Sequence, residues 1–106
     1  MKESIENGIV IKVGENATEN WKLINTNPNF IWLHLDSFPS CHVIIESEKP
    51  PKNVILAGAI QCKYNTKYKH IPNIRVCVTT CGNLKKGNEV GSVIFKSKHK
   101  VWYIKL

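Results

Sequence analysis

Turn-forming residues recur at short intervals along the whole chain, and this spacing limits its fold more than any other feature. Gly, Pro and Asn separate the apolar segments from one another. The longest apolar segment, Val54–Ile60, has only seven residues. A membrane-spanning helix needs ~20. Short segments of this kind predict strands and helices packed around a sheet. We therefore expect an α+β fold without a membrane-spanning segment.

Local patterns predict about six strands and two helices. β-branched or alternating runs indicate strands, and an apolar i, i+4, i+7 pattern that follows a proline indicates a helix. Asn16 or Thr18 is expected to cap the shorter helix. The strands are expected at Ile9–Val13, Phe30–Leu35, Cys41–Glu46, Ile74–Cys81, Ser92–Lys96 and Lys100–Leu106, and the helices at Ala17–Thr26 and Pro51–Lys67. We expect a mainly antiparallel sheet in which the second and third strands, and the last two, form hairpins.

Length and composition fit a single compact domain over residues 1–106. The chain is 42% hydrophobic and 22% charged, which is ordinary for a globular protein, and it is long enough for one core. Met1–Gly8 is polar and has no signal-peptide pattern, so we expect a cytoplasmic protein. Four cysteines without C-x-x-C spacing are expected to be reduced and mostly buried, and we predict no metal or cofactor.

Charge is distributed unevenly along the chain. Residues 1–50 carry four lysines and seven acids, whereas residues 51–106 carry ten lysines and Arg75 against Glu89 alone. A surface of this sign attracts a polyanion and speeds its binding. Nucleic acid is therefore the expected partner, although the same lysines would also serve solubility alone.

The strand Phe30–Leu35 predicts one candidate site. Side chains alternate between the two faces of a strand, so Trp32 and His34 share a face with Asp36, opposite three aliphatic residues. An indole can stack on a base, and an imidazole can stack or bind a phosphate. The alternative is that a second layer covers this face and Trp32 belongs to the core.

His42 begins the strand that returns from the predicted hairpin turn. If the register places it opposite His34, the two imidazoles with Asp36 resemble a general acid and base pair. The alternatives are a histidine that stabilises the loop and one that binds a ligand. A nucleophilic Cys41 oriented by His34 has no sequence pattern in its favour.

Lysines concentrate at two places in the second half of the chain. Thr79–Asn88 is expected to be a mobile basic loop in which lysines and backbone N–H groups suit phosphate oxygens. A solvated turn is the alternative. The second group lies at the end of the longer helix and beyond it. The predicted phosphate-binding residues are Lys63, Lys67, Lys69, Asn83, Lys85 and Lys86.

Four segments, in order and spacing, resemble the NFACT-R domain over most of the chain. They are Val13-Gly14-Glu15-Asn16, Ile31-Trp32-Leu33-His34, Pro39 to Ile45, and Asn83-Leu84-Lys85-Lys86 followed by Gly91. Three positions depart from the family pattern. Phe30 stands where an acidic residue is usual, Glu15 where arginine is common and Cys41 where serine is common.

The resemblance implies a small, solo version of an RNA-binding module. In larger proteins this module accompanies ribosome-associated quality control, where the parent factor recognises tRNA and the ribosome. A related coiled-coil-containing protein is a DNA sensor, so DNA remains an alternative ligand. A suggested role of solo versions in RNA modification makes an RNA-modifying enzyme the second hypothesis, with His34, His42 and Asp36 as its catalytic residues. A protein or ribosome-docking adaptor is the third.

Overall fold

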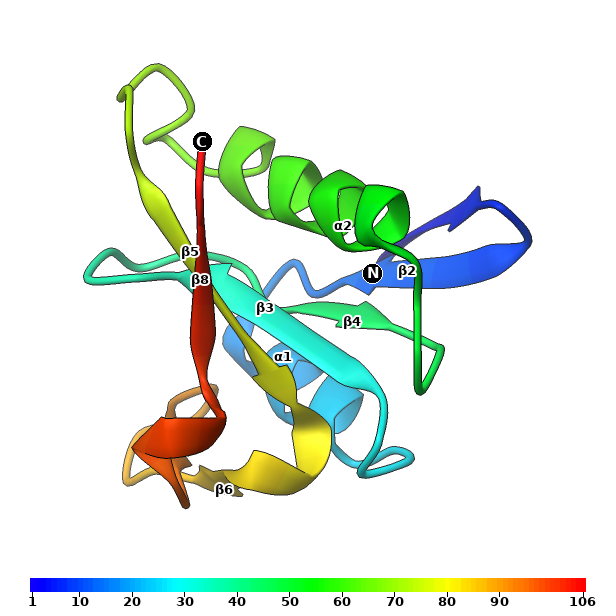
Figure 1. Cartoon of the computed structure of the whole chain (residues 1–106). Coiled ribbons are helices and arrows are strands. Elements are labelled where there is room, and N and C mark those ends of the chain that lie inside the picture. The colour runs from blue at the N-terminus through cyan, green and yellow to red at the C-terminus, as the bar shows by residue number, and fades with distance from the viewer.

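Six strands form one antiparallel sheet, in the order β1-β2-β4-β3-β5-β8 (Figure 1). The computed structural model describes all residues, 1–106. A separate two-stranded sheet, β6-β7, packs below the main one. The strands are β1 (Lys2–Glu6), β2 (Ile9–Val13), β3 (Ile31–Leu35), β4 (Val43–Ile45), β5 (Arg75–Thr80), β6 (Leu84–Lys86), β7 (Val93–Phe95) and β8 (Trp102–Lys105).

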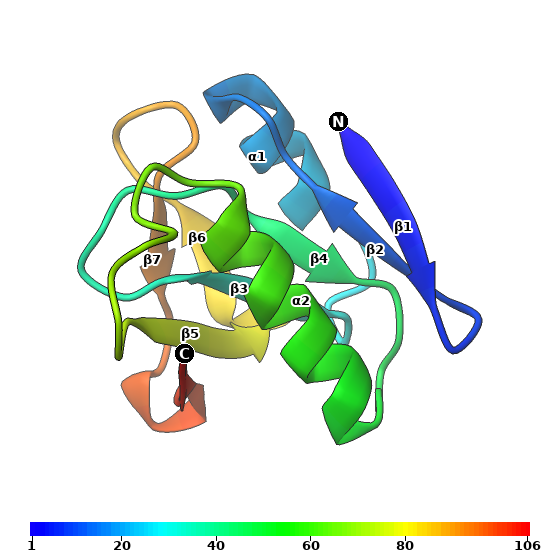
Figure 2. The ribbon, with the colours of Figure 1, turned by 90° about the horizontal axis from the view of Figure 1, so that it is seen from above.

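One helix lies on each face of the main sheet (Figures 1 and 2). α1 (Ala17–Ile24) begins where the Asn16 side chain accepts a hydrogen bond from the backbone N–H of Glu19. α2 (Lys52–Tyr64) follows Pro51 and carries buried Val54, Ala59 and Cys62. Neither helix is both long and apolar enough to cross a membrane. The expected α+β class and mainly antiparallel sheet are therefore confirmed.

The sheet separates two hydrophobic cores. Thirteen buried residues, among them Leu33, Val43 and Val78, pack between the sheet and α2. Six others fill the opposite side, where α1 and the β6-β7 hairpin supply Leu23 and Leu84. Both faces of the central strands are consequently covered.

The hairpin of β3 and β4 has the predicted strands. Trp32 pairs with Ile44, and Leu33 pairs with Val43. The alternation along β3 is also confirmed, because Leu33 faces the α2 side and Trp32 the other. The longer helix ends at Tyr64, three residues earlier than predicted, and its Leu56 and Ile60 are exposed.

The chain beyond residue 80 differs from the prediction. The expected mobile loop is ordered, because a 3₁₀ turn, η1 (Cys81–Asn83), leads directly into β6. The predicted hairpin between the last two strands is wrong, because β7 pairs with β6 and β8 pairs with β5. A second 3₁₀ turn, η2 (Lys98–Lys100), lies between β7 and β8. β1, which pairs with β2, was not predicted.

Candidate nucleic-acid interface

A cleft of about 640 Å³ opens beside β3 and β4. Its walls come from the start of α1, the turn between β3 and β4, the segment after α2 and the turn between β6 and β7. A second cavity of about 440 Å³ shares His34, Pro39, His42 and Gly91 with the first. Most of the residues that line the cleft are polar, and Lys2 and Lys67 are its lysines.

His34 and His42 lie side by side where the two cavities meet. Continuing the β3-β4 register by one residue past Leu33 and Val43 places them opposite each other, and their ring centroids are 5.2 Å apart. The Trp32 ring stacks on His34 at 5.5 Å and meets the edge of His42 at 5.3 Å. The three side chains therefore form one aromatic cluster, which the strand alternation had indicated in part.

Hydrogen bonds determine which ring nitrogen carries the proton in each histidine. The Trp32 indole N–H donates to Nδ1 of His42 over 3.0 Å, so His42 carries its proton on Nε2. Nδ1 of His34 donates to the carbonyl oxygen of Leu35 over 2.6 Å. Burial lowers the pKa of His34, and burial together with the neighbouring His34 lowers the pKa of His42 to about 3. Both rings are neutral at pH 7.

Asp36 does not join the histidines. Its carboxylate accepts hydrogen bonds from both Nε and Nη2 of Arg75, the residue that follows Ile74 at the start of β5. His42 has only 2% of its surface exposed, and its Nδ1 is occupied by Trp32. The contacts of Asp36 and His42 are therefore structural, which favours a binding role over the acid and base hypothesis.

Three other residues predicted to touch nucleic acid are buried. Trp32 is 1% exposed, because Leu23, Leu84 and Phe95 cover its face of the sheet. Lys63 turns inward and donates to the carbonyl oxygen of Leu106 over 3.2 Å. The alternative that a second layer covers this face and Trp32 belongs to the core is confirmed. Lys63 and Asn83 are also buried, so their predicted role as phosphate-binding residues is wrong.

Asn83 has a positioning role instead. Its side-chain amide donates to Thr79 Oγ1 and to the carbonyl oxygen of Ser97, and its Oδ1 accepts from the N–H of Ser97. Thr79 in turn donates to the carbonyl oxygen of Lys100 over 2.7 Å. These hydrogen bonds anchor η2, and with it a group of lysines, on the end of β5.

The remaining predicted lysines are exposed, with five others of the second half. None of the ten lysines in residues 51–106 has an Asp or Glu carboxylate within 4.0 Å, since the cations of the ion pairs are the Met1 amino group, Lys12 and Arg75. Lys86 lies over the Trp21 ring at 5.1 Å, and Lys67 over the Tyr68 ring at 5.4 Å. The exposed set is Lys52, Lys67, Lys69, Lys85, Lys86, Lys96, Lys98, Lys100 and Lys105.

Some residues that shape the cleft were not predicted to do so. The Asn20 side chain accepts from the backbone N–H of His42, and Ser40 Oγ accepts from the N–H of Leu35. A Cβ atom at Gly91 would lie 2.9 Å from Ala17, so the β6-β7 turn touches the start of α1 here. Gly91 was noted as part of the family pattern, but its contact with Ala17 is a long-range one that no local pattern reveals.

The four cysteines are free, and three are buried, as predicted. Cys41 differs because it lines the cleft and its pKa is lowered, first by a hydrogen bond with the Cys62 thiol and further by Lys2. That hydrogen bond and burial raise the pKa of Cys62. Burial raises the pKa of Cys77 to about 11 and of Cys81 to about 12.

We expect Cys41 of the folded protein to be alkylated first. A thiolate is the reactive form, so iodoacetamide at pH 7.5 should modify Cys41 about tenfold faster than the buried thiols. Peptide mass spectrometry over a time course measures this order. Cys41→Ser is the control and should remove the fast phase. Earlier modification of Cys77 or Cys81 would contradict the assignment.

The fold and site define a small α+β domain with a polar cleft and a lysine-rich second half. No family model matches the chain. The Rqc2 homolog RqcH of Bacillus subtilis (strain 168) is 32% identical over 99 residues, which are 90% of this chain and 17% of RqcH. The chain is homologous to that region of RqcH, and the NFACT-R-type resemblance is confirmed.

A solved structure shows the same fold. It is the C-terminal part of the fibronectin/fibrinogen-binding protein from Streptococcus suis, with a TM-score of 0.87 and 23% sequence identity. The match covers 98% of this chain and 43% of the other. The chain thus spans less than half the length of either protein.

Proposed function

We propose that this chain is a nucleic-acid-binding module whose ligand is RNA, in a translation or ribosome quality-control context in the cytoplasm. The observation that carries the proposal is the set of nine exposed lysines in residues 51–106 without a carboxylate partner. Lysines that are not neutralised internally are free to replace the counterions of phosphates. Binding of this kind needs no enzymatic step.

The choice of RNA rests on the relationship to RqcH and on the NFACT-R resemblance. The resemblance implies tRNA or rRNA as the RNA that is bound. The ribosome is then the proposed macromolecular partner. The cleft supports the same proposal, because asparagine side chains from the start of α1 and from the segment after α2 line it together with Lys2 and Lys67. Such groups recognise sugar and phosphate as well as base edges.

The experiment is a salt titration of binding to labelled single-stranded RNA, tRNA and duplex DNA of matched length. A steep loss of affinity with salt, together with preference for one RNA probe, is the expected result. Preference for duplex DNA would support a nucleic-acid-binding module but show that its ligand is DNA and not RNA. Weak binding to all three with no salt dependence would contradict the proposal and point to a protein-docking role.

Replacing Lys85 and Lys86 together with alanine should weaken binding to every probe. Each lysine that neutralises a phosphate contributes close to one unit of slope in log K against log salt, so the slope should flatten by about two units. The matched control is Lys22→Ala with Lys49→Ala, which removes equal charge from the acidic half of the chain. An equal change in both double variants would show a general charge effect instead.

A further inference from the structure

Trp102 is the one tryptophan whose indole has no partner within the protein. The Trp21 indole donates to the carbonyl oxygen of Ser92, and the Trp32 indole donates to His42. Trp102 makes no such bond, and 43% of its surface is exposed. It lies on β8, the last strand of the sheet, which pairs only with β5. The structure itself therefore does not explain why a large aromatic ring stands at this position.

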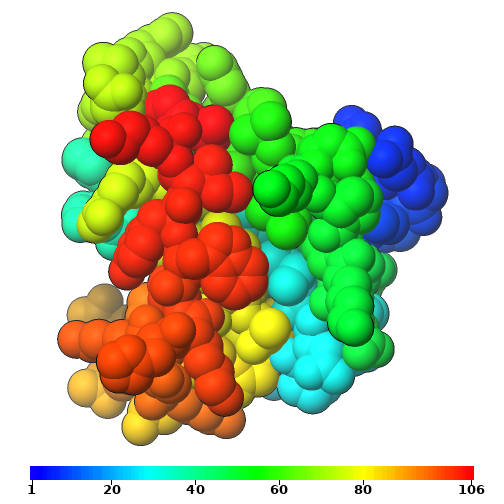
Figure 3. Space-filling model, in the orientation of Figure 1, coloured from blue at the N-terminus to red at the C-terminus, as the bar shows by residue number.

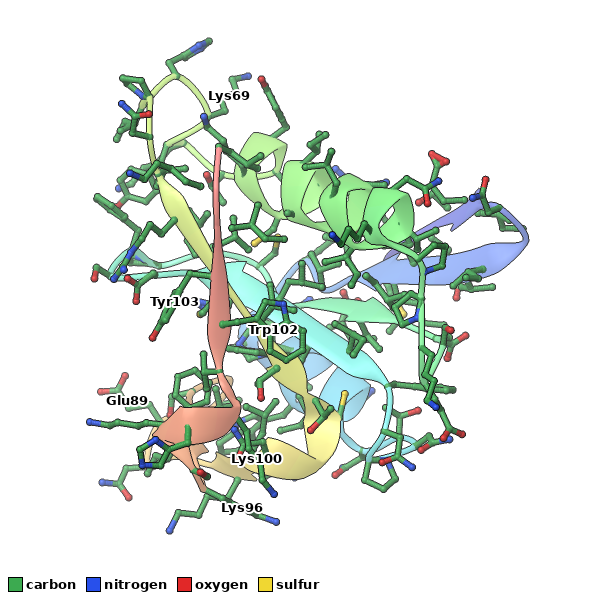
Figure 4. The ribbon with its side chains drawn as sticks, viewed as in Figure 1. Lys69, Glu89, Lys96, Lys100, Trp102 and Tyr103 are labelled. Carbon is green, nitrogen blue, oxygen red and sulfur yellow. The ribbon has the colours of Figure 1, made fainter.

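Lysines surround Trp102 at both ends of β8. Figure 4 shows Lys96 and Lys100 beyond one end of the strand and Lys69 near the other. The Lys69 end is fixed, because Leu106 pairs with Ile74 through two backbone hydrogen bonds. Residues 93–106 carry four lysines and no acid. Glu89, in the β6-β7 turn, is the only nearby acid of this half (Figure 4).

The lysines next to Trp102 are held in place. The buried side chains of Thr79 and Asn83 anchor the backbone of Lys100 and Ser97 with partly buried hydrogen bonds. In the space-filling view, this red and orange part of the chain forms a continuous exposed surface beside α2 (Figure 3). A fixed backbone reduces the entropy that binding would cost. We call Lys69, Lys96, Lys100 and Trp102 the β8 strip.

Tyr103 supports the choice of Trp102 as the stacking residue. The two side chains point to opposite sides of β8 (Figure 4). The Arg75 guanidinium lies over the Tyr103 ring at 4.5 Å and covers one of its faces. Arg75 is also paired with Asp36. The Trp102 ring has no cation placed over it.

We propose that the β8 strip binds a single-stranded stretch of RNA, with an unpaired base stacked on Trp102 and the flanking phosphates on the lysines. This inference rests on the proposed function and adds the kind of RNA that is recognised. Base stacking on an exposed aromatic ring combined with lysine contacts is how single strands are held without sequence readout. The faces of bases in a duplex are already stacked on one another, so a duplex offers Trp102 no base.

The test compares Trp102→Ala with Trp102→Phe on a 12-nucleotide single-stranded RNA and on the same sequence as a duplex. We expect Trp102→Ala to weaken single-strand binding about 5- to 100-fold and duplex binding less than about twofold. Trp102→Phe keeps an aromatic face and should recover most of the affinity. Ile5→Ala, which shortens an exposed apolar side chain on β1 at the opposite edge of the sheet, is the control.

Intrinsic fluorescence supplies an independent readout. Unlabelled poly-uridine should quench the wild-type emission, and Trp102→Phe should lose the part of the quenching that comes from Trp102, because Trp32 is buried. Trp21 is half-buried beneath Lys86, so Trp21→Phe is measured beside it to subtract the quenching of that indole. If no nucleic acid binds the wild type, the proposed function fails. If the wild type binds with a steep salt dependence but Trp102→Ala binds single strands equally well, only the assignment of the β8 strip fails.

Discussion

Replacing His42 with alanine is expected to destabilise the fold by about 3 kcal/mol. The change removes the acceptor of the buried Trp32 indole N–H, and an unsatisfied buried donor costs about 1–3 kcal/mol. The empty volume of the imidazole adds to this loss. Urea unfolding at pH 7.5 measures the difference. His42→Asn, whose amide oxygen can replace Nδ1 as acceptor, is the matched variant and should lose about 1 kcal/mol.

Comparison of the wild type with His42→Asn also tests the pKa of His42. Its pKa falls from 6.5 in the unfolded chain to about 3 in the fold. Between these values the unfolded chain binds more protons, so His42 contributes stability that is full above pH 6.5 and declines as the pH falls toward 3. At pH 4.5 the wild type should have lost about 2.5 kcal/mol through this group.

His42→Asn should lack this part of the pH dependence. Every other ionisable group is common to both proteins, so the difference between the two curves isolates His42. Superimposable curves from pH 7.5 to 4.5 would show that His42 takes up its proton in the fold as easily as in the unfolded chain.

The local patterns that predicted the fold were those in which neighbours along the chain decide the structure. The alternation in Ile31–Leu35 fixed which residues share a face, and Asn16 marked the start of α1. β1 was missed even though Asn7 and Gly8 form a common hairpin turn, and both have positive φ in the structure. In that case the signal was present in the sequence.

Pairing over long distances was not predictable in the same way. Local sequence patterns favour a hairpin of the last two strands, because they are neighbours in the chain. In the structure β8 pairs instead with β5 of the main sheet, and β7 covers Trp32 together with β6. That arrangement decides which candidate site residues are buried. Lys63 illustrates the limit, because its inward position depends on Leu106, 43 residues away.

The sequence predicted which lysines of the candidate site are exposed better than it predicted how the site residues are arranged in space. Lys67, Lys69, Lys85 and Lys86 are exposed, since a lysine without a partner rarely enters a core. The histidine pair followed from a register that the sequence left open. Trp102 was not among the candidates, although it stands between Lys100 and Lys105 on an edge strand. A search for aromatic residues between lysines would have found it.

Replacing Gly91 with alanine is expected to destabilise the protein by about 3 kcal/mol, far more than the same change at Gly8. Both glycines have positive φ, +88° and +77°, so each substitution carries a backbone cost of about 1 kcal/mol. At Gly8 the new methyl group meets no atom within 4 Å. At Gly91 it would lie 2.9 Å from Cα and Cβ of Ala17, and forcing a group into such a contact costs a further 1–3 kcal/mol or so.

The difference between these two variants measures how tightly the β6-β7 turn is held against the start of α1. The Trp21 indole bonds to the carbonyl oxygen of Ser92 in the same turn, so Gly91→Ala should also shift the Trp21 fluorescence toward that of an exposed indole. Gly8→Ala should leave the spectrum unchanged. Because Ala17 and Gly91 both line the cleft, Gly91→Ala should also weaken RNA binding in proportion to the displacement of this turn. Equal unfolding free energies for the two variants would mean that the turn moves freely away from α1 and that the cleft is not a fixed binding site.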